Sequence, residues 1–300
     1  MLSETSHHFG LATLFENNPS KVEFMQSCWP HRAMIYEGRM ERLSCLLAIS
    51  AFESVEALVR YVPELIMWNR PQLPRIARGK EALKLYEEGW TIYAKGIEQF
   101  VSEVKPFLQS LENDLGLGAG SGFCNVFASK AGTGANPHFD YAWGFNIQLR
   151  GTKSWYLTEN QFATHPTESG GVGDLAEGED RFYTTGVYPK EMPSPTMEKT
   201  IGPGSVVFVP RGVWHRTAAC EDSFAVSLDM DPKPWLDWVL KEIRNCLLAR
   251  EQWRECPLGV RGSQEDRERA LNKLQALLKD LPQVSKELNV ESILSMARGD

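Results

Sequence analysis

The stretch from His138 to Leu157 limits what this chain can fold into more than any other part of the sequence. Its apolar and polar residues alternate in the run Phe145-Asn146-Ile147-Gln148-Leu149. This is the period of a strand that is buried on one face. Gly151 then marks a tight turn, and Lys153 begins a second strand-like run, so the pattern predicts a β-hairpin.

Two histidines and one aspartate around this run form a pattern typical of a metal site. His138 and Asp140 are two residues apart, so on an extended chain their side chains project to the same side. His215 follows much later, at the end of a second apolar run. Two imidazoles and one carboxylate can occupy one face of a six-coordinate metal, as in non-heme Fe(II) oxygenases. A His-x-Asp pair alone recurs by chance, so the assignment depends on the surrounding sequence.

The same alternation places further polar side chains beside the candidate ligands. If His138 and Asp140 face a cavity, then Asn146, Gln148 and Lys153 face it too. A lysine inside a sheet is unfavourable unless it meets an anion. Alternatively, Lys153 lies at a strand end and extends its ammonium group to water.

Three motifs follow one another along the chain. They are His138-Phe139-Asp140, the run from Gln148 to Trp155, and the run from Gly202 to Gly212 with His215 after it. In this order they resemble the JmjC-type cupin oxygenases, and most closely the ribosomal-oxygenase-like branch. The resemblance covers roughly residues 20–240 and implies a double-stranded β-helix that uses Fe(II) and 2-oxoglutarate.

The resemblance also implies roles for single residues. It implies that His138, Asp140 and His215 hold the metal. It further implies that Lys153 binds the distal carboxylate of 2-oxoglutarate, since the separation 153 − 138 = 15 is usual in the family. One strand departs from the family pattern, because Phe127 stands where a tyrosine often follows the asparagine and has no hydroxyl to donate. Asn125 stays a candidate for binding the co-substrate, because an amide can hydrogen-bond a carboxylate or a water.

Other residues are candidates through their position near these motifs. Asn146 and Ser227 are further candidates for co-substrate binding, and alternation in the last strand places Asp229 on the same side as Ser227. Trp143 and Trp214 are each close in sequence to a proposed ligand. They either wall the substrate pocket or pack behind it. The sequence offers no convincing acid–base pair or nucleophile.

Composition excludes several classes of protein. The formal net charge is −7, from 32 basic and 39 acidic residues, which argues against bulk binding to nucleic acid or to an anionic membrane. Six cysteines without CxxC spacing indicate reduced thiols and neither a zinc site nor a disulfide framework. The sequence has neither a signal-like N-terminus nor an apolar run of about eighteen residues, so a cytoplasmic location is expected.

The chain divides into an oxygenase domain and a helical module. Residues 1–230 form the predicted JmjC-type cupin domain, with mixed strands and helices before a β-helix core at about 121–230. The fold class is therefore mainly β with helical additions (α+β), a cupin or jelly-roll core. Within it, residues 168–180 are rich in Gly, Glu and Asp. They read as a mobile loop and candidate lid, although a plain solvated insertion explains the same composition.

Residues 231–300 are predicted to be helical. Apolar residues recur at helical spacing after Pro234, and a second helix begins near Ser263 with a capping pattern. The apolar stripes either pack within the chain or form a homodimer, which the resemblance favours.

The sequence thus predicts an Fe(II)- and 2-oxoglutarate-dependent hydroxylase acting on an amino-acid side chain in a protein or peptide. A tailoring hydroxylase for a peptide or amino-acid natural product is the alternative within the same class. Lysine demethylation is a weaker alternative, because nothing resembles a histone-reader module. A cupin that binds metal without turnover is the alternative from another class.

Overall fold

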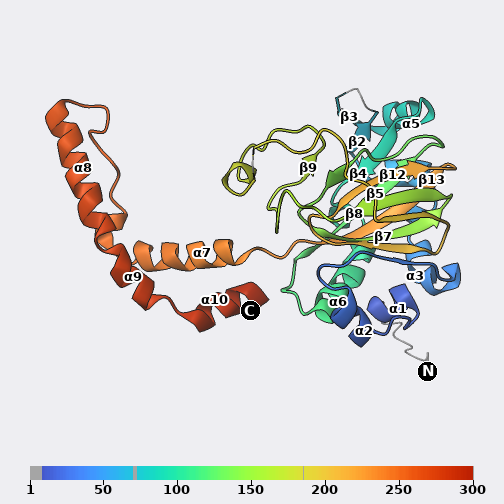
Figure 1. The fold of residues 1–300 in the computed structure, drawn as a ribbon, viewed down its shortest axis with the longest axis horizontal. Coiled ribbons are helices and arrows are strands. Elements are labelled where there is room, and N and C mark those ends of the chain that lie inside the picture. Colours follow the sequence, from blue (N-terminus) through green and yellow to red (C-terminus); the bar gives the residue numbers. More distant parts are fainter. Residues whose placement is uncertain (1–8, 70–72, 185, 300) are drawn as a thin grey trace. The chain divides into compact units, whose positions relative to one another are not determined.

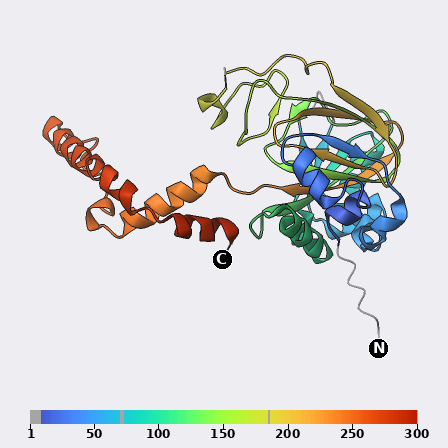
Figure 2. The same ribbon diagram turned by 60° about the horizontal axis from the view of Figure 1, so that its bottom comes forward.

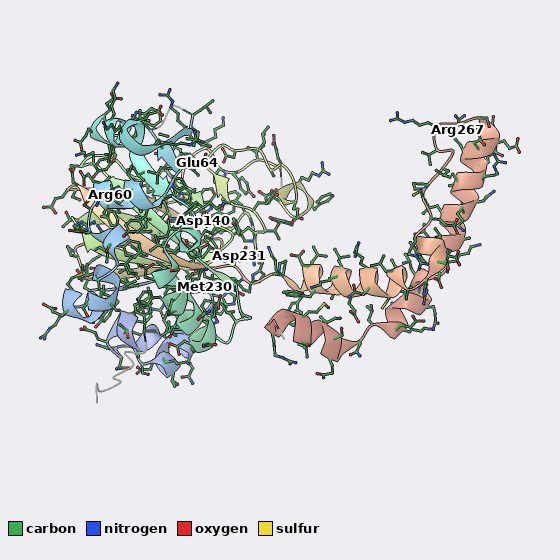
Figure 3. All side chains as sticks on the ribbon, turned by 180° about the vertical axis from the view of Figure 1, so that it is seen from behind. Arg60, Glu64, Asp140, Met230, Asp231 and Arg267 are labelled. Carbon is green, nitrogen blue, oxygen red and sulfur yellow. The ribbon has the colours of Figure 1, made fainter. Side chains whose placement is uncertain are left out.

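The structure is a computed structural model that describes residues 9–69, 73–184 and 186–299 (Figure 1). The chain separates into two compact units, which meet between Asp231 and Pro232. Figure 3 labels Met230 and Asp231 at this boundary, where the last strand of the first unit ends. In the described part of the chain, no helix is long and apolar enough to cross a membrane.

Two antiparallel sheets form the centre of the first unit (Figure 1). Their strands are β1 (Met34–Tyr36), β2 (Leu65–Trp68), β3 (Arg75–Ala77), β4 (Thr91–Ala94), β5 (Gly122–Ser129), β6 (His138–Phe139), β7 (Trp143–Arg150), β8 (Lys153–Thr158), β9 (Gly170–Gly171), β10 (Met197–Ile201), β11 (Val206–Val209), β12 (Trp214–Ala219) and β13 (Ser223–Met230). The larger sheet has the order β1-β11-β7-β13-β5-β4-β2-β3, and the smaller one β10-β8-β12-β6-β9. From β5 to β8 and again from β11 to β13, successive strands alternate between the sheets. This is the predicted double-stranded β-helix.

The predicted hairpin at Gly151 is wrong. Strand β7 pairs with β11 and β13, whereas β8 pairs with β10 and β12, so the turn carries the chain from one sheet to the other. Both edges of β7 are already paired, which leaves none for β8. Alternation shows which face of a strand is buried, but it does not show which strand lies beside it.

Helices cover one face of the larger sheet. They are α1 (Leu11–Phe15), α2 (Lys21–Ser27), α3 (Ser44–Leu47), α4 (Val55–Tyr61), α5 (Gly79–Glu87) and α6 (Lys105–Leu115). Figure 2 shows the N-terminal helices lying in front of the sheets when the lower side of Figure 1 is turned forward. Helix α6 begins at Lys105, where a proline fits the first turn, and two short 3₁₀ turns precede it.

Aromatic packing fills the space between these helices and the sheet. Phe24 lies 5.1 Å from Phe208, which lies 4.9 Å from Phe145, measured between ring centroids. Phe145, Val126 and Val226 are fully buried in this core. Since side chains alternate along a strand, the residues between them on β5, β7 and β13 face the smaller sheet.

The second unit is helical, as predicted for residues 231–300. Its helices are α7 (Trp235–Leu248), α8 (Gln264–Leu278), α9 (Leu281–Glu287) and α10 (Val290–Arg298). A capping box begins α8, in which the Ser263 hydroxyl accepts from the Asp266 amide and the Asp266 carboxylate accepts from the Ser263 amide. Leucines 271, 274 and 278 on α8 remain half exposed.

The acidic stretch 168–180 is attached to the first unit at both ends. Near its start, β9 pairs with β6. At its end, the buried carboxylate of Asp180 accepts hydrogen bonds from the hydroxyls of Tyr183 and Tyr188. Only the part between these two attachments projects as a loop.

The turn between β7 and β8 depends on glycine. Gly151 has φ +69°, and a Cβ there would lie 2.2 Å from the carbonyl oxygen of Asp222. We expect Gly151→Ala to lower the free energy of unfolding by more than about 2 kcal/mol, measured by denaturant unfolding. Gly132→Ala is the control, because Gly132 has φ +81° but open space around it. Equal losses in the two variants would contradict a role for the close approach to Asp222.

Candidate metal centre

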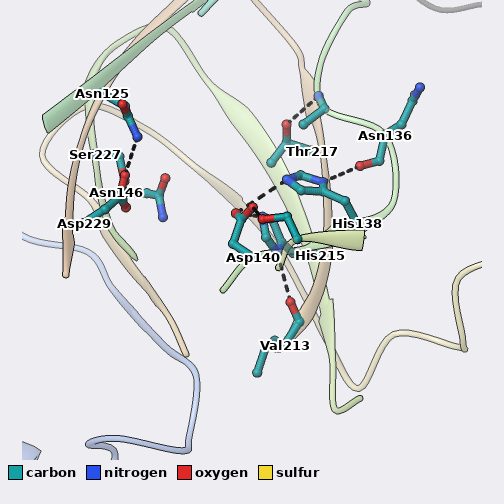
Figure 4. A network of polar contacts seen from close by, with 12 residues as sticks. Asn125, Asn136, His138, Asp140, Asn146, Val213, His215, Thr217, Ser227 and Asp229 are labelled. Atoms are coloured by element: carbon teal, nitrogen blue, oxygen red, sulfur yellow. Dashed lines mark hydrogen bonds and ion pairs between the residues drawn. The ribbon is translucent and has the colours of Figure 1, made fainter. Parts of the chain in front are cut away.

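The fold brings His138, Asp140 and His215 together from two strands and the residue after one of them (Figure 4). His138 on β6 lies directly opposite His215 on β12 in the register of the smaller sheet. The two imidazole centroids are 4.1 Å apart. One ligand atom from each of the three residues lies within 4.8 Å of the others. In the described part of the chain, these three residues form the one such group of His, Cys, Asp and Glu.

Backbone carbonyls orient both imidazoles. The Nδ1 atom of His138 lies 2.7 Å from the carbonyl oxygen of Asn136, and that of His215 lies 3.0 Å from the carbonyl oxygen of Val213. A neutral histidine that donates through Nδ1 keeps its lone pair on Nε2, a tautomer assigned here from the hydrogen-bond partner. The Nε2 atoms of His138 and His215 lie 3.7 Å and 3.5 Å from Oδ2 of Asp140. Three lone pairs therefore converge on one point, which is the donor set that a divalent metal requires.

The protonation states also fit a metal. Burial, together with the neighbouring His138, lowers the pKa of His215 to about 4, so its imidazole is neutral at pH 7. Burial acts to raise the pKa of Asp140, but the two histidines and a hydrogen bond from Ser169 outweigh it and hold that pKa below its usual value. The centre is thus an ionised carboxylate beside a neutral imidazole, ready to bind a cation without first losing a proton.

Lys153 lies in the same sheet as His215 and on the same face. Its strand pairs with β12 so that Leu157 is opposite His215, and Lys153 lies four residues before Leu157. The Lys153 side chain is 4% exposed, and burial lowers its pKa to about 8. Among the residues that the structure describes, none forms a hydrogen bond or ion pair with its ammonium group. The alternative in which Lys153 extends to water is therefore wrong, and a buried ammonium group of this kind is stabilised by an anionic partner.

The larger sheet contributes a buried polar network opposite the metal ligands (Figure 4). The Asn125 amide nitrogen and the Ser227 hydroxyl each donate to the Asp229 carboxylate at 2.6 Å. Ser227 is paired with Asn125 on one side and Asn146 on the other. Asn125, Asn146 and Ser227 therefore lie together on the face that alternation predicts. The amide oxygen of Asn125 accepts from the amide of Gly96, so this side chain is engaged at both ends.

Asp229 is the member of this network that the sequence prediction did not include among the site residues. Burial, and then repulsion from Asp140, raise the pKa of Asp229 to about 7, although its two hydrogen bonds act in the opposite direction. The alternation of residues 223–229 already placed it on the same side as Ser227, although the register of this strand was open. Its raised pKa depends on burial and on the nearby charge of Asp140, and the sequence alone does not bring Asp140 close to it.

The sequence prediction also missed Tyr93. This residue on β4 pairs with Phe127 on β5, and the two rings stack with centroids 4.9 Å apart. Burial raises the pKa of Tyr93, and the charges of Asp229 and Asp140 add to the effect. A hydroxyl therefore exists on the strand beside Phe127, which itself has none.

The prediction that Trp143 and Trp214 line the substrate pocket is wrong for both. Trp143 faces the helix-covered core, where its indole nitrogen donates to the carbonyl oxygen of Pro30 at 2.7 Å. Trp214 is fully buried against Phe139, on the opposite face of β12 from His215. Neighbours along a strand point to opposite faces, so adjacency to a ligand places Trp214 on the wrong side. The alternative, that both pack behind the site, is correct.

Comparison with known proteins agrees with this geometry. Residues 114–237 match the family model described as the JmjC domain. The uncharacterized protein YxbC of Bacillus subtilis is 26% identical over 297 residues, which cover 93% of this chain and 88% of that protein. The bifunctional lysine-specific demethylase and histidyl-hydroxylase NO66 of Dictyostelium discoideum is 25% identical over 182 residues, which cover 59% of this chain. This chain spans only 32% of the length of NO66.

A solved structure shows the same fold. The crystal structure of ycfD from Escherichia coli, a protein called a ribosomal oxygenase, superposes with a TM-score of 0.52 and 15% identity. The match covers 87% of this chain and 67% of that one. The chain therefore contains a JmjC domain at residues 114–237, and it resembles the ribosomal-oxygenase-like branch of the JmjC-type cupin oxygenases.

Proposed function

We propose that this protein is an Fe(II)- and 2-oxoglutarate-dependent hydroxylase that acts on an amino-acid side chain in a protein or peptide. The observation that carries the proposal is that a group of metal-ligating side chains and a buried cation lie on the same face of one sheet. His138, Asp140 and His215 offer three converging lone pairs, and Lys153 offers a buried cation that has no partner among the described residues. A metal that is also bound by a small dianion satisfies both sites at once.

The residues of the chain then have separate tasks. His138, Asp140 and His215 would hold the iron, and Lys153 would bind the far carboxylate of 2-oxoglutarate through a charge-assisted hydrogen bond. When bound, iron and 2-oxoglutarate supply the oxidising chemistry, in which dioxygen places one oxygen atom in a C–H bond and the other in succinate as CO2 leaves. The protein orients the reactants and excludes water. Trp155 contributes to this exclusion, since its ring stacks 6.0 Å from His215.

Two observations support a side chain as the substrate. NO66 is named for the hydroxylation of histidyl residues and the demethylation of lysine, so a relative acts on protein side chains. In this chain, the carboxylate of Asp229 accepts hydrogen bonds from Asn125 and Ser227 on the larger sheet (Figure 4), and it lies close enough to Asp140 for that charge to raise its pKa. An acceptor of this kind suits a substrate group that carries N–H donors.

The first prediction concerns the metal. His215→Ala removes one of three donors, so we expect the variant to lose stoichiometric Fe(II) binding and all turnover while its circular dichroism stays that of the wild type. His31→Ala is the control, because His31 is not a member of the triad. One iron per chain in His215→Ala, measured by anaerobic titration, would contradict the assignment.

The second prediction concerns Lys153. Lys153→Ala should weaken 2-oxoglutarate binding by on the order of 1.5–3 kcal/mol, or more than tenfold, because a charge-assisted bond is lost. Its metal affinity should change little. Calorimetric titration of Co(II)-loaded protein measures both. Lys130→Ala is the matched control, because Lys130 is paired with Glu87 and Asp222 at the surface.

The pH dependence has a definite sign. Lys153 is charged below its pKa of about 8, and a bound carboxylate raises that value. Wild-type affinity for 2-oxoglutarate should therefore be highest below pH 8 and fall as the pH rises beyond it. Equal affinity in wild type and Lys153→Ala at every pH would return Lys153 to a purely structural role.

The third prediction separates an enzyme from a binding protein. With iron, ascorbate and oxygen, the protein should convert 2-oxoglutarate to succinate slowly alone and faster with a substrate from a peptide library, which then gains the mass of one oxygen. Neutralising Glu177 and Glu179 in the exposed acidic stretch should change the coupled rate more than the uncoupled one, because their charge favours a basic peptide. Absence of succinate would favour the cupin without turnover.

We also propose that the C-terminal unit forms a homodimer. Half-exposed leucines recur on α8 at 271, 274 and 278, and Leu236 and Leu240 on α7 are more than half exposed. Such stripes are buried in a helical interface. Sedimentation analysis should give twice the chain mass, and Leu271→Glu together with Leu274→Glu should give the monomer. A monomeric wild type would contradict the homodimer.

The cytoplasmic location stays a prediction.

A further inference from the structure

The two oxygens of the Asp140 carboxylate have different surroundings. Oδ2 is the atom that faces the Nε2 atoms of both histidines, at 3.7 Å and 3.5 Å. Oδ1 accepts a hydrogen bond from the hydroxyl of Ser169 at 2.9 Å. The Asp140 side chain is 45% exposed, so packing alone does not hold its orientation. The hydrogen bond from the Ser169 hydroxyl therefore restricts the orientation of this carboxylate.

The position of Ser169 is defined by the backbone that follows it. In β9, Gly170 pairs with Phe139 and Gly171 pairs with His138. A Cβ at Gly170 would lie 2.7 Å from the Phe139 ring, so only glycine allows the strand this close. The amide of Gly171 donates to Asp174 at 2.8 Å, which closes the turn behind it. Ser169 is therefore held at the register where its hydroxyl reaches Asp140.

The same backbone continues into the acidic stretch. Beyond Asp174, the chain exposes Leu175, Phe182 and Val187, which are 64%, 77% and 52% exposed. Its far end is tied down where Tyr188 donates to Asp180. A partner that binds these exposed side chains would act on one end of a segment whose other end hydrogen-bonds a metal ligand.

We propose that Ser169 is a positioning residue for the metal centre, which holds Oδ1 of Asp140 so that only Oδ2 is presented beside the two histidines. Through this hydrogen bond, residues 168–184 are coupled to the metal centre. The inference rests on the proposed function, because it takes the triad as a metal site. Loss of the hydroxyl frees Asp140 to rotate, which turns Oδ1 toward the same point or swings the carboxylate to solvent.

The test uses the full chain and Co(II), whose visible spectrum reports its ligands. Ser169→Ala should weaken Co(II) binding on the order of tenfold, as expected for a group that orients a metal ligand, and should change the spectrum of the bound ion. Ser169→Thr keeps the hydroxyl and should restore both. Thr167→Val is the matched control, because the Thr167 hydroxyl contacts Tyr183 in the same segment and does not touch Asp140.

Amide exchange measures the coupling independently of activity. Coupling between two sites is reciprocal, so Co(II) should slow exchange in residues 168–184 of the wild type and of Thr167→Val, but not of Ser169→Ala. Wild-type affinity and spectrum in Ser169→Ala, or an equal loss in Thr167→Val, would overturn the role of Ser169. Unchanged exchange in the wild type would overturn the coupling. A wild type that binds no Co(II) would instead refute the metal site on which the proposed function rests.

Discussion

The structure depends on the filling of one face of the eight-stranded sheet by apolar side chains. Phe145, Phe208 and Val226 pack there against the N-terminal helices. Burial of large apolar groups is the main favourable contribution to folding, so it determines which way each of these strands faces. The residues between them are then turned toward the second sheet. Asn125, Asn146 and Ser227 occupy the cavity face because their neighbours occupy the core.

The second sheet contributes the two histidines of the candidate metal centre. His138 and His215 lie opposite each other on two paired strands. The relative position of their imidazoles is therefore fixed by strand pairing and does not depend on a loop. Their Nδ1 atoms are held by carbonyls of the same backbone. Donors oriented in this way need little rearrangement when an ion arrives. The charged forms of Lys153 and Asp229 are less well stabilised by the protein. Lys153 has no partner among the described residues, and burial raises the pKa of Asp229 to about 7. Buried charges left in this condition are characteristic of a site that a ligand completes.

The sequence predicts much of the candidate site, because side chains alternate between the two faces of a strand with a period of two residues. Two-residue alternation placed His138 with Asp140 and Asn146 with Gln148, and the same rule placed Ser227 with Asp229. Two interpretations that went beyond this period were wrong. Closeness in sequence to a ligand suggested Trp143 and Trp214 as pocket walls, although each points to the opposite face. The tight turn at Gly151 suggested a hairpin, although the chain crosses there between sheets.

The strand faces, the metal-binding residue types and the helical character of residues 231–300 can be read from the chain, because they follow from local period and side-chain chemistry. Which strands are neighbours depends on the folded molecule. Strand pairing brings Tyr93 beside Phe127, Ser169 to the second carboxylate oxygen of Asp140, and Asp229 close to Asn125. Pairing between strands depends on long-range packing over the whole core, and no local pattern records it.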